Sequence, residues 1–155
     1  MLNDLLLNRE FGYKFGVKST AAARAFSYNR EPLVRMANTY IAPGDYQLEE
    51  LFEGVKKGIY MKSFTEWNID DRRFQSKYVG LECYLIENGQ LTDKMLRRPS
   101  LELTTFGILQ NIDAVAKGYF APYGTCGKSD PMQGVPVSMG GAPFRIRNIR
   151  VGGGQ

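Results

Sequence analysis

The sequence predicts an α+β fold made mainly of antiparallel β-sheet, in a sandwich or barrel-like arrangement, with two or three short helices. Seventeen glycines and nine tyrosines among 155 residues favour β structure with many turns. Alternating side chains from Tyr78 to Ile86 lead into Asn88-Gly89, a residue pair typical of a tight hairpin turn. Helical periodicity is confined to short segments, so the helices should be few.

The length fits one domain, which we place at residues 1–151 with a tail at 152–155. Residues 1–44 should contain an opening helix and a connecting segment, and residues 45–151 a sheet-rich core. The chain should open with a helix because its long side chains recur on one face at Leu2, Leu5, Leu6 and Arg9. Asn3 can cap this helix and Gly12 can end it.

The polar stretch 19–32 is interpreted as a loop or a short helical turn. A longer, amphipathic helix is predicted from Asp45 to Lys57, because Pro43-Gly44 interrupts the chain before it and Gly58 suits the position after it. Its apolar side chains form one stripe that would pack on a sheet: Leu48, Leu51, Phe52 and Val55.

From Tyr78 the pattern becomes that of a strand, and Asn88-Gly89 turns it into a hairpin. Cys83 alternates with apolar neighbours on this strand, so we expect it to be a buried core thiol. The remaining elements are a short helix and two strands, in this order: Thr104–Asp113, Val135–Met139 and Phe144–Val151.

The composition excludes several classes of protein. A formal charge of +4 permits weak attraction to polyanions but is mild for a dedicated nucleic-acid binder. Two cysteines do not make a disulfide framework. No secretory signal and no apolar run long enough to cross a membrane is visible. We therefore expect a cytoplasmic protein without a membrane partner.

The candidate functional residue is a cysteine flanked by glycines, in the segment Gly124-Thr125-Cys126-Gly127-Lys128, which we expect to be a loop. A phosphate-binding loop is disfavoured because Pro122 stands where that motif needs a glycine N–H. Nucleophilic catalysis is disfavoured because the chain contains no histidine to act as its base. Two interpretations stay open on the residues alone: a small residue in a tight turn, or one ligand of an incomplete metal site.

Several segments, taken together and in order, resemble the C-terminal domain of the TldD/PmbA family of zinc metallopeptidases, also called modulators of DNA gyrase. They are Arg35-Met36-Ala37-Asn38-Thr39-Tyr40, Pro43-Gly44, Gly58-Ile59-Tyr60, Tyr84-Leu85-Ile86-Glu87-Asn88-Gly89, Gly124-Thr125-Cys126-Gly127-Lys128, Gly134-Val135-Pro136-Val137 and Val151-Gly152-Gly153. Each segment is a weak signal alone. Their order covers nearly the whole chain.

The resemblance implies a zinc ion held by two histidines of a His-Glu-x-x-x-His helix and by a cysteine that matches Cys126. Gly124, Gly127 and Lys128 would then support the ligand loop. The chain has no histidine, so the helix that carries the other ligands and the general-base glutamate is absent from it. No catalytic residue is therefore assigned within this chain. The resemblance implies zinc in the full-length enzyme, and we expect none bound tightly to this chain alone.

The family implies cleavage of unfolded or extended peptides. We expect this chain to be a C-terminal domain separated from an upstream segment, as a piece or as the product of a split gene, and to be inactive alone. Its expected partners are the missing N-terminal half or a family partner subunit, in a dimer, together with the peptide substrate, and we do not expect nucleic acid. The alternative is a non-catalytic protein-interaction module or a regulator of a nucleic-acid enzyme, which the basic charge balance would favour.

Overall fold

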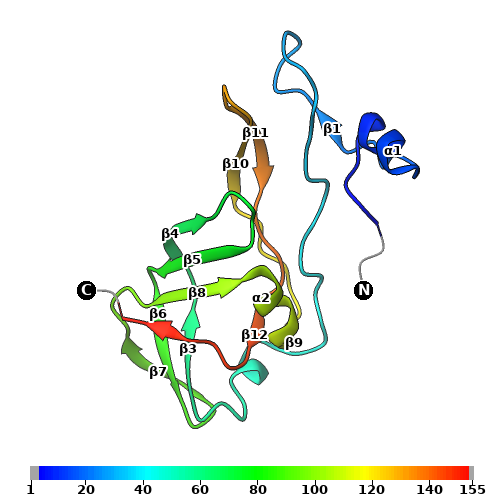
Figure 1. Cartoon of the computed structure of the whole chain (residues 1–155). Coiled ribbons are helices and arrows are strands. Elements are labelled where there is room, and N and C mark those ends of the chain that lie inside the picture. Colours follow the sequence, from blue (N-terminus) through cyan, green and yellow to red (C-terminus); the bar gives the residue numbers. More distant parts are fainter. Residues whose placement is uncertain (1–3, 154–155) are drawn as a thin grey trace. The chain divides into compact units, whose positions relative to one another are not determined.

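The computed structural model describes residues 4–153, and the chain forms two compact units (Figure 1). The first unit combines Met1–Ala42 with Phe120–Gly141, and the second combines Pro43–Tyr119 with Ala142–Gln155. The single domain expected over residues 1–151 and its tail stay a prediction. No helix of the described part is long and apolar enough to cross a membrane.

The predicted fold class is confirmed, because every pair of named strands is antiparallel and the helices are few and short. The strands form separate small sheets, and the part of the chain that is described contains no closed barrel. In the second unit, one sheet has the order β13-β8-β5-β4, another β3-β6-β7, and a third β12-β9. The bounds are β3 Lys57–Met61, β4 Phe64–Ile69, β5 Gln75–Gly80, β6 Cys83–Glu87, β7 Gln90–Met95, β8 Ser100–Thr104, β9 Ile112–Val115, β12 Phe144–Ile146 and β13 Val151–Gly152.

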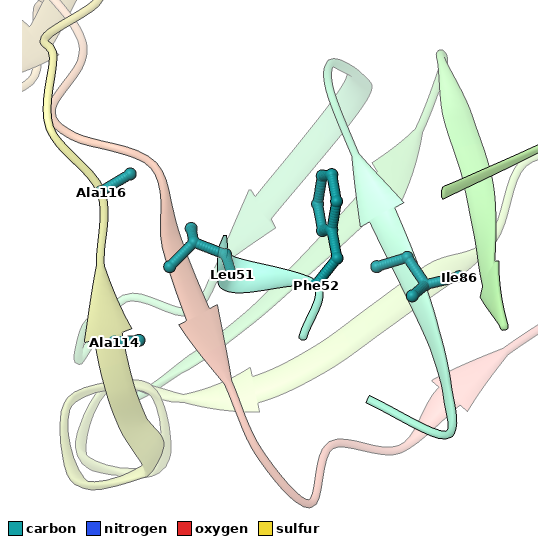
Figure 2. Close-up of a cluster of buried hydrophobic side chains, with 5 residues drawn as sticks. All are labelled: Leu51, Phe52, Ile86, Ala114 and Ala116. Atoms are coloured by element: carbon teal, nitrogen blue, oxygen red, sulfur yellow. The ribbon is translucent and has the colours of Figure 1, made fainter. Parts of the chain in front are cut away.

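The core of the second unit is a cluster of buried side chains: Leu51, Phe52, Ile86, Ala114 and Ala116 (Figure 2). Leu51 and Phe52 lie between the two alanines on one side and Ile86 on the other. The Phe52 ring also contacts Tyr60, with 5.4 Å between the ring centroids. Burial of such apolar side chains is the main favourable contribution to folding of this unit.

The helix predicted from Asp45 to Lys57 is wrong in its extent, although its apolar stripe does face the core. Only a 3-10 turn forms, η1 at Glu49–Leu51. Before it, the Gly44 N–H donates to the Ala116 carbonyl oxygen at 3.0 Å, and Tyr46 bridges to Ala116. After it, Gly54 adopts a φ of 70°, which a right-handed helix cannot continue. Long-range backbone pairing therefore replaces the local helix.

The predicted hairpin is confirmed. Asn88 and Gly89 have φ angles of 51° and 80° and join β6 to β7. The strand expected from Tyr78 to Ile86 is instead divided between β5 and β6, which belong to different sheets. The chain changes sheets at Gly80, where an added Cβ would lie 2.2 Å from the Cys83 sulfur atom. Cys83 is fully buried, so its interpretation as a core thiol is confirmed.

The short helix predicted at Thr104–Asp113 is confirmed as α2 (Thr105–Asn111), with the Thr104 hydroxyl accepting from the Gly107 N–H. The predicted strand at Val135–Met139 is confirmed as β11 (Gln133–Ser138). The strand expected at Phe144–Val151 is divided into β12 and β13, with Asn148 at a φ of 56° between them.

The first unit contains α1 (Arg9–Phe15), β1 (Ala23–Arg24), β2 (Leu33–Val34), β10 (Tyr123–Lys128) and β11. The opening helix begins later than predicted, because Asn8 is its cap and accepts from the Phe11 N–H at 2.9 Å. Gly12 lies inside the helix rather than at its end, and Gly16 ends it with a φ of 65°. Leu2 and Asn3 of the prediction lie outside the described residues.

The stretch 19–32 is neither all loop nor a helical turn. Its β1 pairs antiparallel with β2, and Ala23 lies opposite Val34. This pairing joins two segments about ten residues apart, each only two residues long, so neither shows the alternation by which strands are usually predicted.

Candidate functional site

Cys126 lies within β10, not in a loop as expected. β10 pairs with β11 over its whole length, and Cys126 is directly opposite Val135. The actual turn of this hairpin lies between Lys128 and Gln133, where Ser129 has a φ of 77°. Side chains alternate along a strand, so Gly124, Cys126 and Lys128 belong to one face of the hairpin. The ladder therefore fixes where the thiol is presented.

Two methionine side chains lie against the flanking glycines. A Cβ on Gly124 would lie 2.3 Å from the Met139 methyl carbon, and one on Gly127 would lie 2.7 Å from the Met132 sulfur. Real Cβ atoms do not approach other heavy atoms so closely. Both contacts are with flexible side chains, since Met139 is 44% and Met132 74% exposed, so a larger residue could displace them. Cys126 is left half-buried between the two glycines.

Lys128 is held by the first unit itself. Its ammonium donates to the carbonyl oxygen of Val34 at 2.8 Å, which ties the end of β10 to β2. The contact is to a neutral carbonyl and not to a carboxylate. Its observed role is to position the strand that carries Cys126.

Gln133, at the start of β11, organises a buried polar network that the sequence did not reveal. Its side-chain amide nitrogen donates to the Glu31 carboxylate at 2.9 Å, and its amide oxygen accepts from the Phe26 N–H at 3.3 Å. Its backbone carbonyl accepts from Nη2 of Arg35. Gln133 and Arg35 are 3% and 5% exposed. No local pattern marks these residues, since the partners are about 100 positions apart in the chain.

The Arg35 guanidinium makes only part of the hydrogen bonds that it can donate. Its Nε and Nη1 are buried and have no hydrogen-bond partner within the described residues. No carboxylate there forms an ion pair with it. Arg35 follows β2, and its backbone N–H donates to the Ala22 carbonyl, so the β1–β2 pairing holds it in place. A buried guanidinium without a counter-charge is energetically costly.

The described residues do not make up a zinc site by themselves. Within 4–153, no group of three or more His, Cys, Asp or Glu side chains could hold a metal ion. Cys83, the second cysteine, is buried in the other unit. Structural and catalytic zinc sites need at least three protein ligands. Cys126 has the chemistry of one ligand, and a complete site would need ligands from outside the described residues.

A second charged cluster lies in the second unit and has a structural role. Asp113 on β9 accepts hydrogen bonds from Arg145 and Arg147 of the β12 segment. Hydrogen bonds from Arg145, and then those from Arg147, lower the pKa of the Asp113 carboxyl to about 2. Two of the basic residues that make up the positive charge balance are thus paired with a carboxylate, which weakens the alternative of a regulator of a nucleic-acid enzyme.

Comparison with known proteins identifies a family and several relatives that are similar to this chain. Residues 1–153 match the family described as the PmbA/TldA metallopeptidase C-terminal domain. A metalloprotease from Methanothermobacter thermautotrophicus is 34% identical over 99% of this chain and 33% of its own length. A protein named zinc metalloprotease TldD homolog, from Saccharolobus solfataricus, is 34% identical over 99% of this chain and 34% of its length.

The fold is also found in a solved structure. The crystal structure of TldE from Thermococcus kodakarensis superposes with a TM-score of 0.69, covering 94% of this chain and 30% of that one, at 13% identity. At that identity the likeness concerns the fold alone. This chain spans about a third of the length of the relatives it matches.

Proposed function

The chain belongs to the PmbA/TldD metallopeptidase family, whose C-terminal domain it matches over 1–153, and from this premise we propose that it supplies Cys126 as one thiolate ligand of a zinc site. The other ligands and the general-base glutamate would come from a second polypeptide of the same family, in a dimer. The assembled site would hydrolyse unfolded or extended peptides. The chain alone is inactive under this proposal, since it contains no histidine.

The observation that carries the proposal is the way in which Cys126 is held. A hairpin ladder holds a half-exposed thiol between two glycines, and the described residues contain no group of three or more possible metal ligands. A core cysteine would be fully buried, as Cys83 is. A redox pair would need a second accessible thiol, and the other cysteine, Cys83, is fully buried. One ligand of a shared metal site fits these features.

The sheet that contains Cys126 also suits an extended substrate. β10 and β11 form a two-stranded sheet, so each strand has one side that no other named strand pairs with. An extended peptide can add to such an edge through its own backbone N–H and C=O groups, largely independently of sequence. We therefore propose unfolded or extended peptides as substrates, bound beside the thiol.

Each residue has a separate task in this proposal. Cys126 binds as a thiolate, the glycines allow Met132 and Met139 to pack against the strand, and Lys128 fixes the end of β10 to Val34. When bound, zinc would polarise a peptide carbonyl and lower the pKa of a water molecule. The activity therefore needs both polypeptides.

The test is zinc retention, with the part of the S. solfataricus relative that this chain does not match as the second polypeptide. The full chain is mixed with zinc, alone and with that polypeptide, then desalted, and bound zinc is measured by mass spectrometry. The relative's own matched third, added in place of this chain, is the positive control. We expect about one zinc per complex, little zinc on the chain alone, and loss of zinc in Cys126→Ser but not in Cys83→Ala.

Denatured casein should be cleaved by the complex of the two polypeptides and by the complex that contains Cys83→Ala. It should not be cleaved by the chain alone or by the complex that contains Cys126→Ser. Stoichiometric zinc on the chain alone that survives Cys126→Ser would refute the proposal. So would a complex in which Cys126→Ser retains as much zinc as the wild-type chain.

A further inference from the structure

The second unit contains a groove of about 410 Å³, bordered by β3, β6, β13 and the segment 96–99 that joins β7 to β8. Ile59 on β3 and Leu85 on β6 lie directly opposite each other and both line it. They belong to the sheet face turned away from the core, because the alternating residues Tyr60 and Ile86 pack with Phe52 on the other face. The groove has the size of a ligand-binding site and an apolar wall that the core does not use.

The charges along the groove all have the same sign. Among the described residues that line it, Lys57 and Arg97 are the only charged ones. Neither forms an ion pair in the described part of the chain. Glu87 lies opposite Lys57 in the strand register, but its carboxylate binds Lys94 at 2.9 Å. Two unpaired cations beside an apolar wall are complementary to a carboxylate at the end of an apolar group.

Arg97 lies on a short segment that is fixed at both ends. The Leu96 N–H donates to the Cys83 carbonyl oxygen at 2.9 Å, and the Pro99 carbonyl oxygen accepts from the Gly80 N–H at 2.8 Å. Pro99 is buried and lines the groove as well. The backbone that carries the arginine is therefore in place before a ligand binds, which lowers the entropy cost of binding.

Backbone atoms border the groove as well as side chains. β3 and β13 each lie at the end of a sheet, so each has one side that no other named strand of the described chain pairs with. Gly152 and Gly153 line the groove and have no side chain, so they present backbone N–H and C=O groups. Both glycines are exposed, and Ile59 and Leu85 are only half-buried. A fatty acid would favour an enclosed apolar pocket, whereas an extended peptide uses an open groove with backbone edges.

We propose that this groove binds the C-terminal residues of an extended, apolar peptide. The terminal carboxylate binds Arg97 and Lys57, and the last side chains lie against Ile59 and Leu85. The inference goes beyond the proposed function, because it requires neither Cys126 nor zinc. It adds recognition of a free carboxyl end to a chain for which only sequence-independent peptide binding has been argued above.

Fluorescence polarisation of the full chain in EDTA tests this with a fluorescein-labelled pentapeptide that ends in Leu-Val-Leu. The peptide with a free C-terminal carboxylate should bind at least about ten-fold more tightly than the same peptide with a C-terminal amide. Replacing the last three residues by serine should weaken binding of the free acid at least about ten-fold as well, because the apolar contacts are lost. The sheet edge beside Cys126 would bind acid and amide alike, so the ratio of their affinities reports on the groove.

Variants of the two cations identify the residues responsible. Arg97→Met and Lys57→Met should each weaken binding of the free acid at least about five-fold and leave binding of the amide within two-fold. Arg72→Met, at an exposed position between β4 and β5, is the matched control and should change neither affinity by more than about two-fold. Lys57, Arg97 and Arg72 are all exposed, so circular dichroism should show the wild-type melting temperature for each variant.

Three results would overturn the proposal. They are equal affinities for the acid and the amide, an acid preference that both Arg97→Met and Lys57→Met leave unchanged, and decanoate that binds more tightly than the peptide acid, which would indicate a fatty-acid site instead. If Arg97 controls the preference for the free acid but Cys126→Ser leaves zinc retention unchanged, the groove stands and the zinc proposal fails.

Discussion

Arg145 binds Asp113 through two parallel hydrogen bonds, from Nε to Oδ1 at 2.8 Å and from Nη2 to Oδ2 at 2.9 Å. The third nitrogen of the same guanidinium donates to the backbone carbonyls of Leu51 and Glu53 at 3.0 and 3.1 Å. One side chain on β12 thus links β9 to the η1 turn, whose Leu51 belongs to the core of the second unit.

Arg145→Lys should destabilise the chain. A lysine has one ammonium and cannot reproduce both the paired contact with Asp113 and the carbonyl contacts. The expected fall in the free energy of unfolding is about 1–3 kcal/mol, from urea denaturation at pH 7. Arg150→Lys, at an exposed position, is the control and should change it by less than about 0.5 kcal/mol. Equal effects of the two variants would contradict the linking role of Arg145.

Asp113→Asn should remove part of the acid sensitivity of the fold. The pKa of the Asp113 carboxyl falls from 3.8 to about 2, chiefly through its hydrogen bond from Arg145. A lowered folded-state pKa stabilises the protein fully above about pH 4, and this stabilisation is lost as the pH falls through about 2. Because the side chain is 36% exposed, water screens the effect to about 1 kcal/mol.

Urea unfolding of the wild type and Asp113→Asn at pH 7 and pH 2 measures this contribution. The difference between them should be present at pH 7 and shrink towards pH 2. Asp71→Asn, in an exposed turn, is the control. A difference that grows as the pH falls would have the wrong sign and would exclude the ion pair as its cause.

Gly124→Ala should destabilise the hairpin that carries Cys126. Its new Cβ would lie 2.3 Å from the Met139 methyl carbon, so the methionine must move; because that side chain is flexible and 44% exposed, the free energy of unfolding should fall by less than about 1 kcal/mol. Met139→Ala in the same chain should recover part of that loss, because it vacates the space. Gly153→Ala is the control, since nothing lies within 4 Å of its added Cβ. A double variant no more stable than the sum of its two single variants would argue against this contact.

The two cysteines should differ sharply in reactivity. Cys83 is fully buried, and burial raises the pKa of its thiol above the ordinary 9.0, with a smaller contribution from Glu82. Cys126 is partly exposed. Iodoacetamide should therefore alkylate Cys126 in the folded chain and both cysteines in guanidinium chloride, as mass spectrometry would show. Comparable labelling of Cys83 in the folded chain would contradict the placement of that thiol in the core.

Signals that act over a few residues were enough to predict part of this structure. Asn88-Gly89 specifies its turn because both residues tolerate positive φ, and Thr104 caps α2 through a hydroxyl three residues from its partner. The alternation around Cys83 correctly indicated that its thiol is buried, although Leu81, two residues before it, is 61% exposed. The antiparallel fold class follows from the same local patterns, and the ordered motifs indicated the family before any contact was known.

Local signals failed where a distant segment competed for the same backbone. Residues 45–57 have the apolar stripe of a helix, but Gly44 and Tyr46 pair with Ala116, some 70 positions away. Gly12 looked like a helix end and lies inside α1, where the backbone of Val17 and Ser19 packs closely against it. A long-range contact in the first case, and a contact with the turn that follows the helix in the second, outweighs a propensity worth a fraction of a kcal/mol per residue.

By itself, then, the sequence determined the family, the fold class and Cys126 as the candidate ligand. Only the tertiary structure decided that Cys126 lies on a paired strand, that Arg145 and Asp113 link the second unit, and that Arg35 is buried with two unpartnered nitrogens. The physical reason is that hydrogen bonds and buried charges depend on which side chains meet in space. Arg35 and Gln133 are 98 positions apart, and the residues around each of them in the sequence do not indicate that the two are in contact.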